Sequence, residues 1–348
     1  MAEEVVLMKG NEAIAHAAIR IGVDGYFGYP ITPQSEILET LAEEKPWETT
    51  GMVVLQAESE VAAINMVYGG AASGKMVMTS SSSPGVSLKQ EGISYIAGAE
   101  LPCLIVNVMR GGPGLGTIQP SQADYFQTVK GGGHGDYRLI ALAPASVQEM
   151  ADFVGIAFDL AFKYRNPAII LADGVIGQMM EKVVLPEQRT RLTDEEVIAR
   201  CPWATTGRTH HRTPNIITSL ELDPAEMEKR NIHLQKKICR NRRERSTFRR
   251  TSLRRCRIFD RSFRFLCPHC PKGNGNGSGR RHQSWFAPSY YPMAVPVESY
   301  CSTRRTGKRY PHCRIERRTN GRRCPSGRRM QSACRTLRTS GWYCSRSG

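Results

Sequence analysis

Four short loops in the first half of the chain carry residue types that could bind or transform a ligand. Two acids stand one residue apart at Glu58 and Glu60, Thr32 lies between two prolines, Arg110 opens a run of glycines, and residues 80–85 are rich in serine. A guanidinium can hold a carboxylate through two parallel hydrogen bonds, and flanking prolines restrict the backbone of a threonine. Because each loop follows a short apolar run, the four form a constellation rather than an isolated motif.

The elements that carry these loops alternate between apolar runs and helical patterns. We expect strands at residues 5–7, 26–28, 52–56, 75–79, 101–109, 139–143 and 168–172. We expect helices at residues 11–21, 33–43, 59–73, 85–97 and 147–164. Apolar strands separated by helices indicate a parallel sheet covered on both faces, which is a doubly wound α/β fold. Ligands bind such sheets at the carboxyl ends of the strands, where the four loops lie.

The composition of the chain changes at Lys237. Residues 1–237 contain 20 Lys and Arg against 28 Asp and Glu, whereas residues 238–348 contain 28 against 4. The net charge of +16 is therefore the sum of an acidic segment and a strongly basic one.

The basic segment has the composition of a displaced reading frame. It is rich in Arg, Cys, Ser, Gly and Trp, whose codons carry G in the middle position. Codons chosen for residues 237–265, 281–297 and 319–336 can be read one base later, in a single frame, as globular-looking sequence. We therefore interpret residues 238–348 as a frameshifted, non-native tail. Its dense like charge and few aliphatic residues predict disorder.

The first 237 residues are long enough for one large α/β domain and an extension. Nine of the eleven cysteines lie beyond Lys237, and the remaining two, Cys103 and Cys201, are too few for a disulfide framework. The N-terminus carries acids where a signal peptide needs a basic region, and no apolar run approaches the roughly 18 residues that span a bilayer. We expect a cytoplasmic protein that is not associated with a membrane.

Five strings resemble the α subunit of 2-oxoacid:ferredoxin oxidoreductases, most closely the 2-oxoisovalerate (3-methyl-2-oxobutanoate) type. They are YPITP, AESEVAAINM, TSSSSPG, VMRGGPGLGTIQPSQADYFQ and GGGHGDY. The resemblance covers residues 5–237 directly. It implies a pyrimidine-binding domain over residues 1–190 and a linker or extension over 191–237, with the tail at 238–348 standing in place of a transketolase-C-like domain.

The resemblance implies thiamine diphosphate chemistry. The reaction would be oxidative decarboxylation of a 2-oxoacid to an acyl-CoA and CO2, with coenzyme A as co-substrate and ferredoxin as electron acceptor. The diphosphate half of the cofactor site and Mg²⁺ are expected on a β subunit, and iron–sulfur clusters on γ and ferredoxin-like δ subunits. No metal ligand set is expected on this chain, and the isolated chain is expected to be inactive.

Glu60 is the expected catalytic residue by its position in the family motif. It would protonate the aminopyrimidine of the cofactor and favour its imino tautomer. An apolar pocket around such a carboxyl group would raise its pKa. Glu58 is the alternative, because sequence alone does not separate two acids one residue apart, and Pro30 is placed with them at the cofactor. Without the motif, both acids would be interpreted as solvated residues at the start of a helix.

Thr32 and Arg110 are expected to bind the substrate. Thr32 matches a family position that touches the substrate carboxylate or the cofactor, or it caps a helix that begins at Pro33. Arg110 would grip a carboxylate, or it forms a structural ion pair. Gly114-Leu115, where many relatives carry Ser-Thr, favours a branched-chain substrate, with 2-oxoglutarate and pyruvate as alternatives.

Other features favour functions of a different class. The arginine-rich tail would attract polyanions by counterion release, so a nonspecific nucleic-acid binder is the rival hypothesis, and no specific nucleic acid is expected. A chain without its second domain could also be an inactive scaffold. The glycine-rich stretch at 131–136 could hold a phosphate on backbone amides, or be a flexible turn. Cys267 and Cys270 have zinc-like spacing but lie in the tail.

Overall fold

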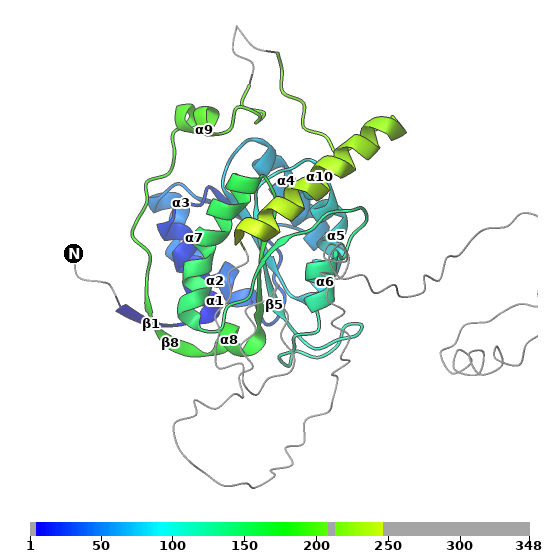
Figure 1. Cartoon of the computed structure of the whole chain (residues 1–348). Helices are drawn as coiled ribbons and strands as arrows, with labels where there is room; N and C mark the ends of the chain where they lie inside the picture. Colours follow the sequence, from blue (N-terminus) through cyan, green and yellow to red (C-terminus); the bar gives the residue numbers. More distant parts are fainter. Residues whose placement is uncertain (1–4, 208–212, 246–348) are drawn as a thin grey trace, which may run out of the picture. The chain divides into compact units, whose positions relative to one another are not determined.

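A six-stranded parallel sheet forms the centre of the protein. The computed structural model describes residues 5–207 and 213–245 (Figure 1). The strands follow the order β3-β2-β4-β5-β7-β6. They are β2 (Gly25–Gly28), β3 (Val53–Gln56), β4 (Val77–Ser81), β5 (Leu104–Met109), β6 (Ile140–Leu142) and β7 (Ala168–Asp173). The predicted doubly wound parallel sheet is confirmed.

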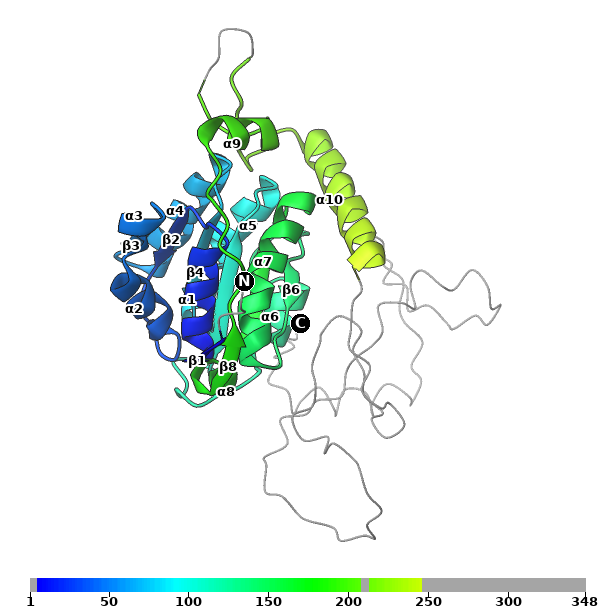
Figure 2. The same ribbon diagram turned by 90° about the vertical axis from the view of Figure 1, so that its left-hand side faces the viewer.

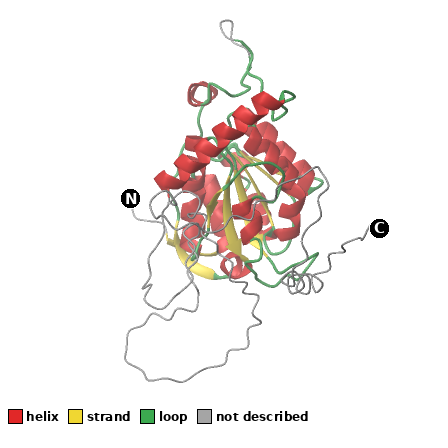
Figure 3. Cartoon of the chain, turned by 45° about the vertical axis from the view of Figure 1, so that its right-hand side comes forward, coloured by secondary structure: helices red, strands yellow, loops and turns green. Residues whose placement is uncertain are grey.

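Helices cover both faces of this sheet (Figure 3). They are α1 (Gly10–Arg20), α2 (Ser35–Glu44), α3 (Pro46–Thr49), α4 (Glu60–Ala72), α5 (Ser83–Gly98), α6 (Tyr125–Lys130), α7 (Val147–Tyr164), α8 (Gly174–Gln178), α9 (Asp194–Arg200) and α10 (Pro224–Arg245). Those at 46–49, 125–130, 174–178, 194–200 and 224–245 are not among the predicted helices.

Side-chain alternation along the strands divides the core into two main clusters. Leu104, Val106 and Val108 of β5 face the cluster that α1, α2 and α7 cover, whereas Ile105 faces the cluster beneath α4 and α5. Figure 2 shows α1 and α7 side by side on the first face. The strands run parallel, so the loops that follow them begin at the same edge of the sheet.

The prediction that residues 5–7 join the parallel sheet is wrong. β1 (Val5–Lys9) instead pairs antiparallel with β8 (Met180–Val184) in a separate two-stranded ribbon. Val5 and Leu7 are more than half exposed, so β1 buries one face and would not fill an inner position of a sheet that is covered on both sides.

Helix α10 crosses the position at which the charge of the chain changes. The Lys237 ammonium donates hydrogen bonds to Glu100 Oε1 at 2.7 Å and to the Arg165 carbonyl at 3.0 Å, and Lys237 is buried. Burial lowers the pKa of Lys237, and the Glu100 carboxylate opposes that change. The helix continues from Ile238 to Arg245, so the predicted boundary at 237 does not coincide with a structural one.

Residues 246–348 lie outside the described residues, so the disorder expected for the tail stays a prediction, as does a ligand role for Cys267 and Cys270. Within the described ranges, no helix is both long and apolar enough to cross a membrane.

Ile14 tests the packing between α1, the sheet and α7. Its side chain is fully buried in the larger core cluster. We expect Ile14→Ala to lower the free energy of unfolding by about 2–5 kcal/mol, because it removes buried methylene groups and leaves a cavity. Ile198→Ala on α9 is the control, since Ile198 is 36% exposed and its truncation should cost less than about 1 kcal/mol. Equal losses in urea unfolding would contradict this assignment of the core.

Candidate functional site

A series of hydrogen bonds between side chains fixes the loop after β2. The Tyr26 hydroxyl contacts Ser80 Oγ at 2.6 Å, and Ser80 in turn donates to the Gln34 side-chain carbonyl. Gln34 then donates to the Tyr29 carbonyl at 3.1 Å. Burial raises the pKa of Tyr26 far above its usual range, so this phenol is a neutral hydrogen-bonding group. The network ties the loop to the neighbouring strand β4.

Thr32 does not cap the following helix, which corrects one of the two predictions for this residue. The N-cap of α2 is Gln34, and its backbone N–H donates to the Ile31 carbonyl at 3.0 Å, so a turn separates Pro33 from the first helical residue. The Thr32 and Pro30 side chains are exposed. Both therefore remain open to a ligand or a partner.

Arg110 joins this loop to the glycine-rich loop after β5. Its guanidinium donates to the Thr32 carbonyl through Nη1 and to the Leu115 carbonyl through Nη2, each at 3.0 Å. Arg110 is 7% exposed, and its Nε is buried without a hydrogen-bond partner among the described residues. No described carboxylate forms an ion pair with it, so the structural ion pair considered from sequence is not found in this part of the chain. A buried cation with an unused donor is suited to an anionic ligand.

The two acids after β3 differ in how far they are buried. Ser59 is the N-cap of α4, where its hydroxyl accepts from the Ala62 amide at 3.2 Å and donates to Glu58 Oε1 at 2.8 Å. Glu58 is exposed, whereas Glu60, the first residue of α4, is 6% exposed. A helix that starts at Glu60 turns this side chain inward, toward α5.

Gly85 leaves the space that the Glu60 carboxylate needs. A Cβ atom at Gly85 would lie 2.6 Å from Glu60 Oε1 and would collide with Ser81 Oγ, so no other residue fits without a shift of its neighbours. The hydroxyls of Ser81 and Ser82, at the end of β4, are buried without a partner in the described ranges. Buried polar atoms that lack a partner mark a place where a ligand can bond.

The first turn of α5 connects the Glu60 and Arg110 halves of the site. Ser83 Oγ accepts from the Arg110 amide at 3.1 Å and donates to Asp124 Oδ2 at 2.6 Å. Asn107, fully buried in β5, donates to the same Asp124 oxygen at 2.9 Å and accepts from the Ser83 amide. Sequence reasoning did not identify Asn107 and Asp124; the one signal was a polar residue inside the apolar run of β5.

Lys89 is a third residue that sequence reasoning did not identify. It is fully buried in α5, and its ammonium donates to Thr79 Oγ1 at 3.2 Å. Burial lowers the pKa of Lys89 to about 8, and the field of Glu60 partly opposes this change. A lysine in a helical pattern is usually solvated, so periodicity alone would not reveal it.

The glycine-rich stretch at 131–136 is bonded to α5. The Gly133 amide donates to the Tyr137 hydroxyl at 3.0 Å, and the His134 carbonyl accepts from the Ser94 hydroxyl at 2.5 Å. Two of its polar backbone groups are therefore already used, and a phosphate-binding role stays a prediction. Among the described residues, no group of three or more His, Cys, Asp or Glu could hold a metal ion.

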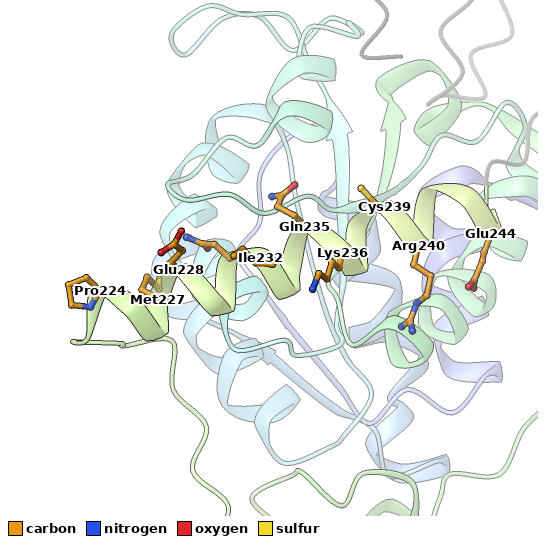
Figure 4. A pocket seen from close by; sticks show the side chains of 10 residues that line it. Pro224, Met227, Glu228, Ile232, Gln235, Lys236, Cys239, Arg240 and Glu244 are labelled. Carbon is orange, nitrogen blue, oxygen red and sulfur yellow. The ribbon is translucent and has the colours of Figure 1, made fainter. Parts of the chain in front are cut away.

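A hollow lies elsewhere, along one face of α10 (Figure 4). Its volume is about 1150 Å³, and the described residues that line it belong to this helix, among them Met227, Ile232 and Lys236. It contains none of the strand-end residues. The chemistry of the strand-end loops, rather than the size of a hollow, therefore identifies the candidate site.

Comparisons with known proteins show the family of the chain. The chain is 56% identical over 231 residues to ketoisovalerate oxidoreductase subunit VorB of Methanothermobacter marburgensis, a match that covers 66% of this chain and 63% of the relative. It is 42% identical over 226 residues to 2-oxoglutarate synthase subunit KorA of Archaeoglobus fulgidus, covering 65% and 64% respectively. The chain thus spans somewhat less than two thirds of the length of these relatives.

A solved structure and a family profile extend the comparison. The 2-oxoglutarate:ferredoxin oxidoreductase of Magnetococcus marinus, determined with 2-oxoglutarate, coenzyme A and succinyl-CoA bound, superimposes with a TM-score of 0.56 at 29% identity. The match covers 68% of this chain and 46% of that one. The profile of the family described as pyruvate flavodoxin/ferredoxin oxidoreductase, thiamine diphosphate-binding, matches residues 16–244. The chain belongs to this family, which confirms the resemblance drawn from its motifs.

Proposed function

We propose that this chain is the α subunit of a thiamine diphosphate-dependent 2-oxoacid:ferredoxin oxidoreductase that acts on 3-methyl-2-oxobutanoate. The reaction converts the branched-chain 2-oxoacid to an acyl-CoA and CO2 while ferredoxin is reduced. The observation that carries the proposal is the buried Glu60 at the start of α4, beside whose carboxylate Gly85 leaves room. The same first turn of α5 is bonded to Arg110 through Ser83.

The residues of this chain fit the aminopyrimidine end of the cofactor. Glu60 offers a carboxyl group, and the hydroxyls of Ser81 and Ser82, which have no partner in the part of the chain that the structure describes, lie at the end of the neighbouring strand. When bound, thiamine diphosphate supplies the nucleophilic carbon and the electron sink for decarboxylation. Glu60 would share a proton with the ring nitrogen of the aminopyrimidine, and its burial excludes water that would otherwise exchange that proton.

Arg110 and Thr32 would hold the substrate carboxylate. The guanidinium is fixed by two backbone carbonyls and keeps its Nε free of partners among the described residues, so it brings a positive charge without further side-chain ordering. The Thr32 hydroxyl is exposed at the same loop and would add a hydrogen bond, with Pro30 lining the cofactor side.

The preference for a branched substrate rests on relatives and on one loop residue. The relative at 56% identity is named a ketoisovalerate oxidoreductase subunit. Leu115 leaves its side chain 80% exposed at the glycine-rich loop, where an apolar acyl group rather than a second carboxylate would be accommodated. The 2-oxoglutarate-type relative at 42% identity keeps a dicarboxylate as the alternative substrate.

The rest of the machinery would come from partner subunits. A β subunit would carry Mg²⁺ and the diphosphate half-site, and γ and δ subunits would carry iron–sulfur clusters and deliver electrons to ferredoxin. The assembly would work in the cytoplasm. The isolated chain would be inactive.

Glu60→Gln in the assembled enzyme tests the proton-sharing role. We expect kcat to fall by about 10²–10⁴-fold, because the amide cannot supply a proton to the aminopyrimidine. Glu58→Gln makes the same change in an exposed side chain and should leave kcat within a few-fold of the wild type. Full turnover of the Glu60→Gln enzyme at saturating thiamine diphosphate would sink the proposal.

Arg110→Met tests recognition of the substrate carboxylate. We expect kcat/KM for 3-methyl-2-oxobutanoate to fall by about 10–100-fold, since a charge-assisted hydrogen bond contributes roughly 1.5–3 kcal/mol. Arg200→Met, which removes a guanidinium that packs 4.0 Å from the centre of the Phe162 ring, is the control and should leave kcat/KM unchanged. Thermal unfolding of both variants separates lost recognition from a loosened loop. A folded Arg110→Met enzyme with normal kcat/KM would contradict the assignment.

A further inference from the structure

The glycine-rich loop after β5 turns back toward the strand from which it leaves. Arg110 forms an antiparallel bridge with Pro120, and the Gly111 amide donates to the Gln119 carbonyl at 2.9 Å. The chain then reaches Asp124, the residue directly before α6. Because the two ends of the loop lie close together, a side chain at the returning end can fix the position of the starting end.

One carboxylate oxygen of Asp124 makes this connection. Asp124 Oδ2 accepts from Ser83 Oγ at 2.6 Å and from Asn107 Nδ2 at 2.9 Å, and both donor residues are buried. Hydrogen bonds to a carboxylate are shorter and stronger than those between neutral groups. Asp124 thus joins the end of the loop to the first turn of α5 and to β5.

The Asp124 carboxylate also determines how its two partners are oriented. A serine hydroxyl has one proton and a carboxylate can only accept, so Ser83 donates to Asp124 and accepts from the Arg110 amide at 3.1 Å. Asn107 donates through its amide nitrogen, so its side-chain oxygen accepts from the Ser83 amide at 3.2 Å. Without the carboxylate, the Ser83 proton is free to turn to the Arg110 carbonyl, which lies 3.1 Å from the hydroxyl.

The backbone that Ser83 fixes carries the guanidinium of the candidate site. Arg110 donates to the carbonyls of Thr32 and Leu115, and Leu115 lies in the loop that Asp124 closes. Asp124 therefore acts on the backbone of Arg110 and on one of the two groups that orient its side chain. In the described ranges these two residues form no ion pair with each other, so the influence of Asp124 on the guanidinium is indirect.

We propose that Asp124 is a positioning residue for Arg110: its carboxylate fixes Ser83 and Asn107, and thereby holds the Arg110 backbone and the glycine-rich loop where the guanidinium can receive the carboxylate of the substrate. The part of this inference that concerns the substrate rests on the function proposed above. The effect of Asp124 on the loop does not, and it is measurable without substrate or cofactor.

Two substitutions separate the hydrogen bonds of Asp124 from its charge. Both bonds end on the same oxygen atom, so the side-chain carbonyl in Asp124→Asn can accept both of them. Asp124→Leu keeps a branched side chain but accepts neither. A positioning role requires that Asp124→Asn behaves like the wild type and that Asp124→Leu does not, whereas a role for the negative charge requires that both variants fail.

Hydrogen exchange of the full-length chain without ligands tests the effect on the loop. In Asp124→Leu we expect the amides of residues 110–119 to exchange about 10-fold faster or more, because the bonds that hold the start of the loop are lost. Exchange in α1 should be unchanged. Wild-type exchange of the loop in folded Asp124→Leu would overturn the proposal, and so would an equal acceleration in α1, which would show a general loss of stability.

The control for exchange is Asp159→Leu, which makes the same substitution at an exposed position of α7 and should leave the loop unchanged. If circular dichroism shows that Asp124→Leu does not fold, Ser83→Ala replaces it, since this variant lacks the hydroxyl between Asp124 and the Arg110 amide. The loop must then exchange faster, and wild-type exchange again refutes the proposal.

Kinetics of the assembled enzyme test whether Asp124 acts through Arg110. We expect kcat/KM for 3-methyl-2-oxobutanoate to fall by about 10-fold in Asp124→Leu, because the guanidinium is misplaced, and Asp124→Asn should restore it. Added to Arg110→Met, Asp124→Leu should cause no further loss, because the side chain that it positions is already absent. Losses that multiply in the double variant, or an equal loss in Asp124→Asn, would contradict the positioning role.

The two measurements together separate this inference from the proposed function. Faster loop exchange in Asp124→Leu, combined with normal kcat/KM in Arg110→Met, would refute the substrate role of Arg110 and leave the effect of Asp124 on the loop standing. Impaired kcat/KM in Arg110→Met, combined with wild-type loop exchange in Asp124→Leu, would refute the role of Asp124 alone.

Discussion

The hydrogen bonds from the Arg110 guanidinium to the carbonyls of Thr32 and Leu115 hold the candidate site together. They join a loop from β2 to a loop from β5, although β4 separates these strands in the sheet. Ser83 then ties the Arg110 amide to the start of α5, which is also the turn that faces Glu60. One side chain thus fixes the distance between the region that would recognise a carboxylate and the region that would exchange a proton.

The charged side chains of this site are buried, which strengthens their interactions. Glu60, Lys89 and Arg110 are each less than a tenth exposed, in a family of folds whose helices and strands normally bury apolar side chains. A charge removed from water interacts strongly with its neighbours, and Arg110 Nε, which has no hydrogen-bond partner among the described residues, is suited to an anionic ligand. The serine run after β4 and the close approach of α4 and α5 supply the polar and steric frame for these charges.

Much of the fold was predictable because its inner strands are uniformly apolar and its helices are amphipathic. β1 was misplaced because three apolar residues do not show whether a strand is covered on one face or on two. The start of α2 was predicted two residues early because a proline at a helix start and a proline in the preceding turn look alike in sequence. α10 went unrecognised because its mean hydropathy is low and its support comes from a distant ion pair between Lys237 and Glu100.

The site was partly predictable for a related reason. Loops at strand ends could be located from periodicity, which placed Glu60, Thr32 and Arg110 near one edge. The burial that distinguishes Glu60 from Glu58 depends on the residue at which α4 begins, and the cap at Ser59 decides this. Contacts such as Ser83 to Asp124 and Lys89 to Thr79 join different elements, so local pattern could not reveal them.

Helix α10 bears on how this chain could be joined to other proteins. The charge of the sequence changes at Lys237, but that lysine is bonded to Glu100 in the middle of a helix, and Tyr164 donates to Glu244, one residue before the end of that helix. A chimera spliced at the compositional step would cut through these contacts. A graft that keeps helix α10 through Arg245 would preserve its contacts with the rest of the domain, and the fusion point should be chosen by tertiary contacts rather than by composition.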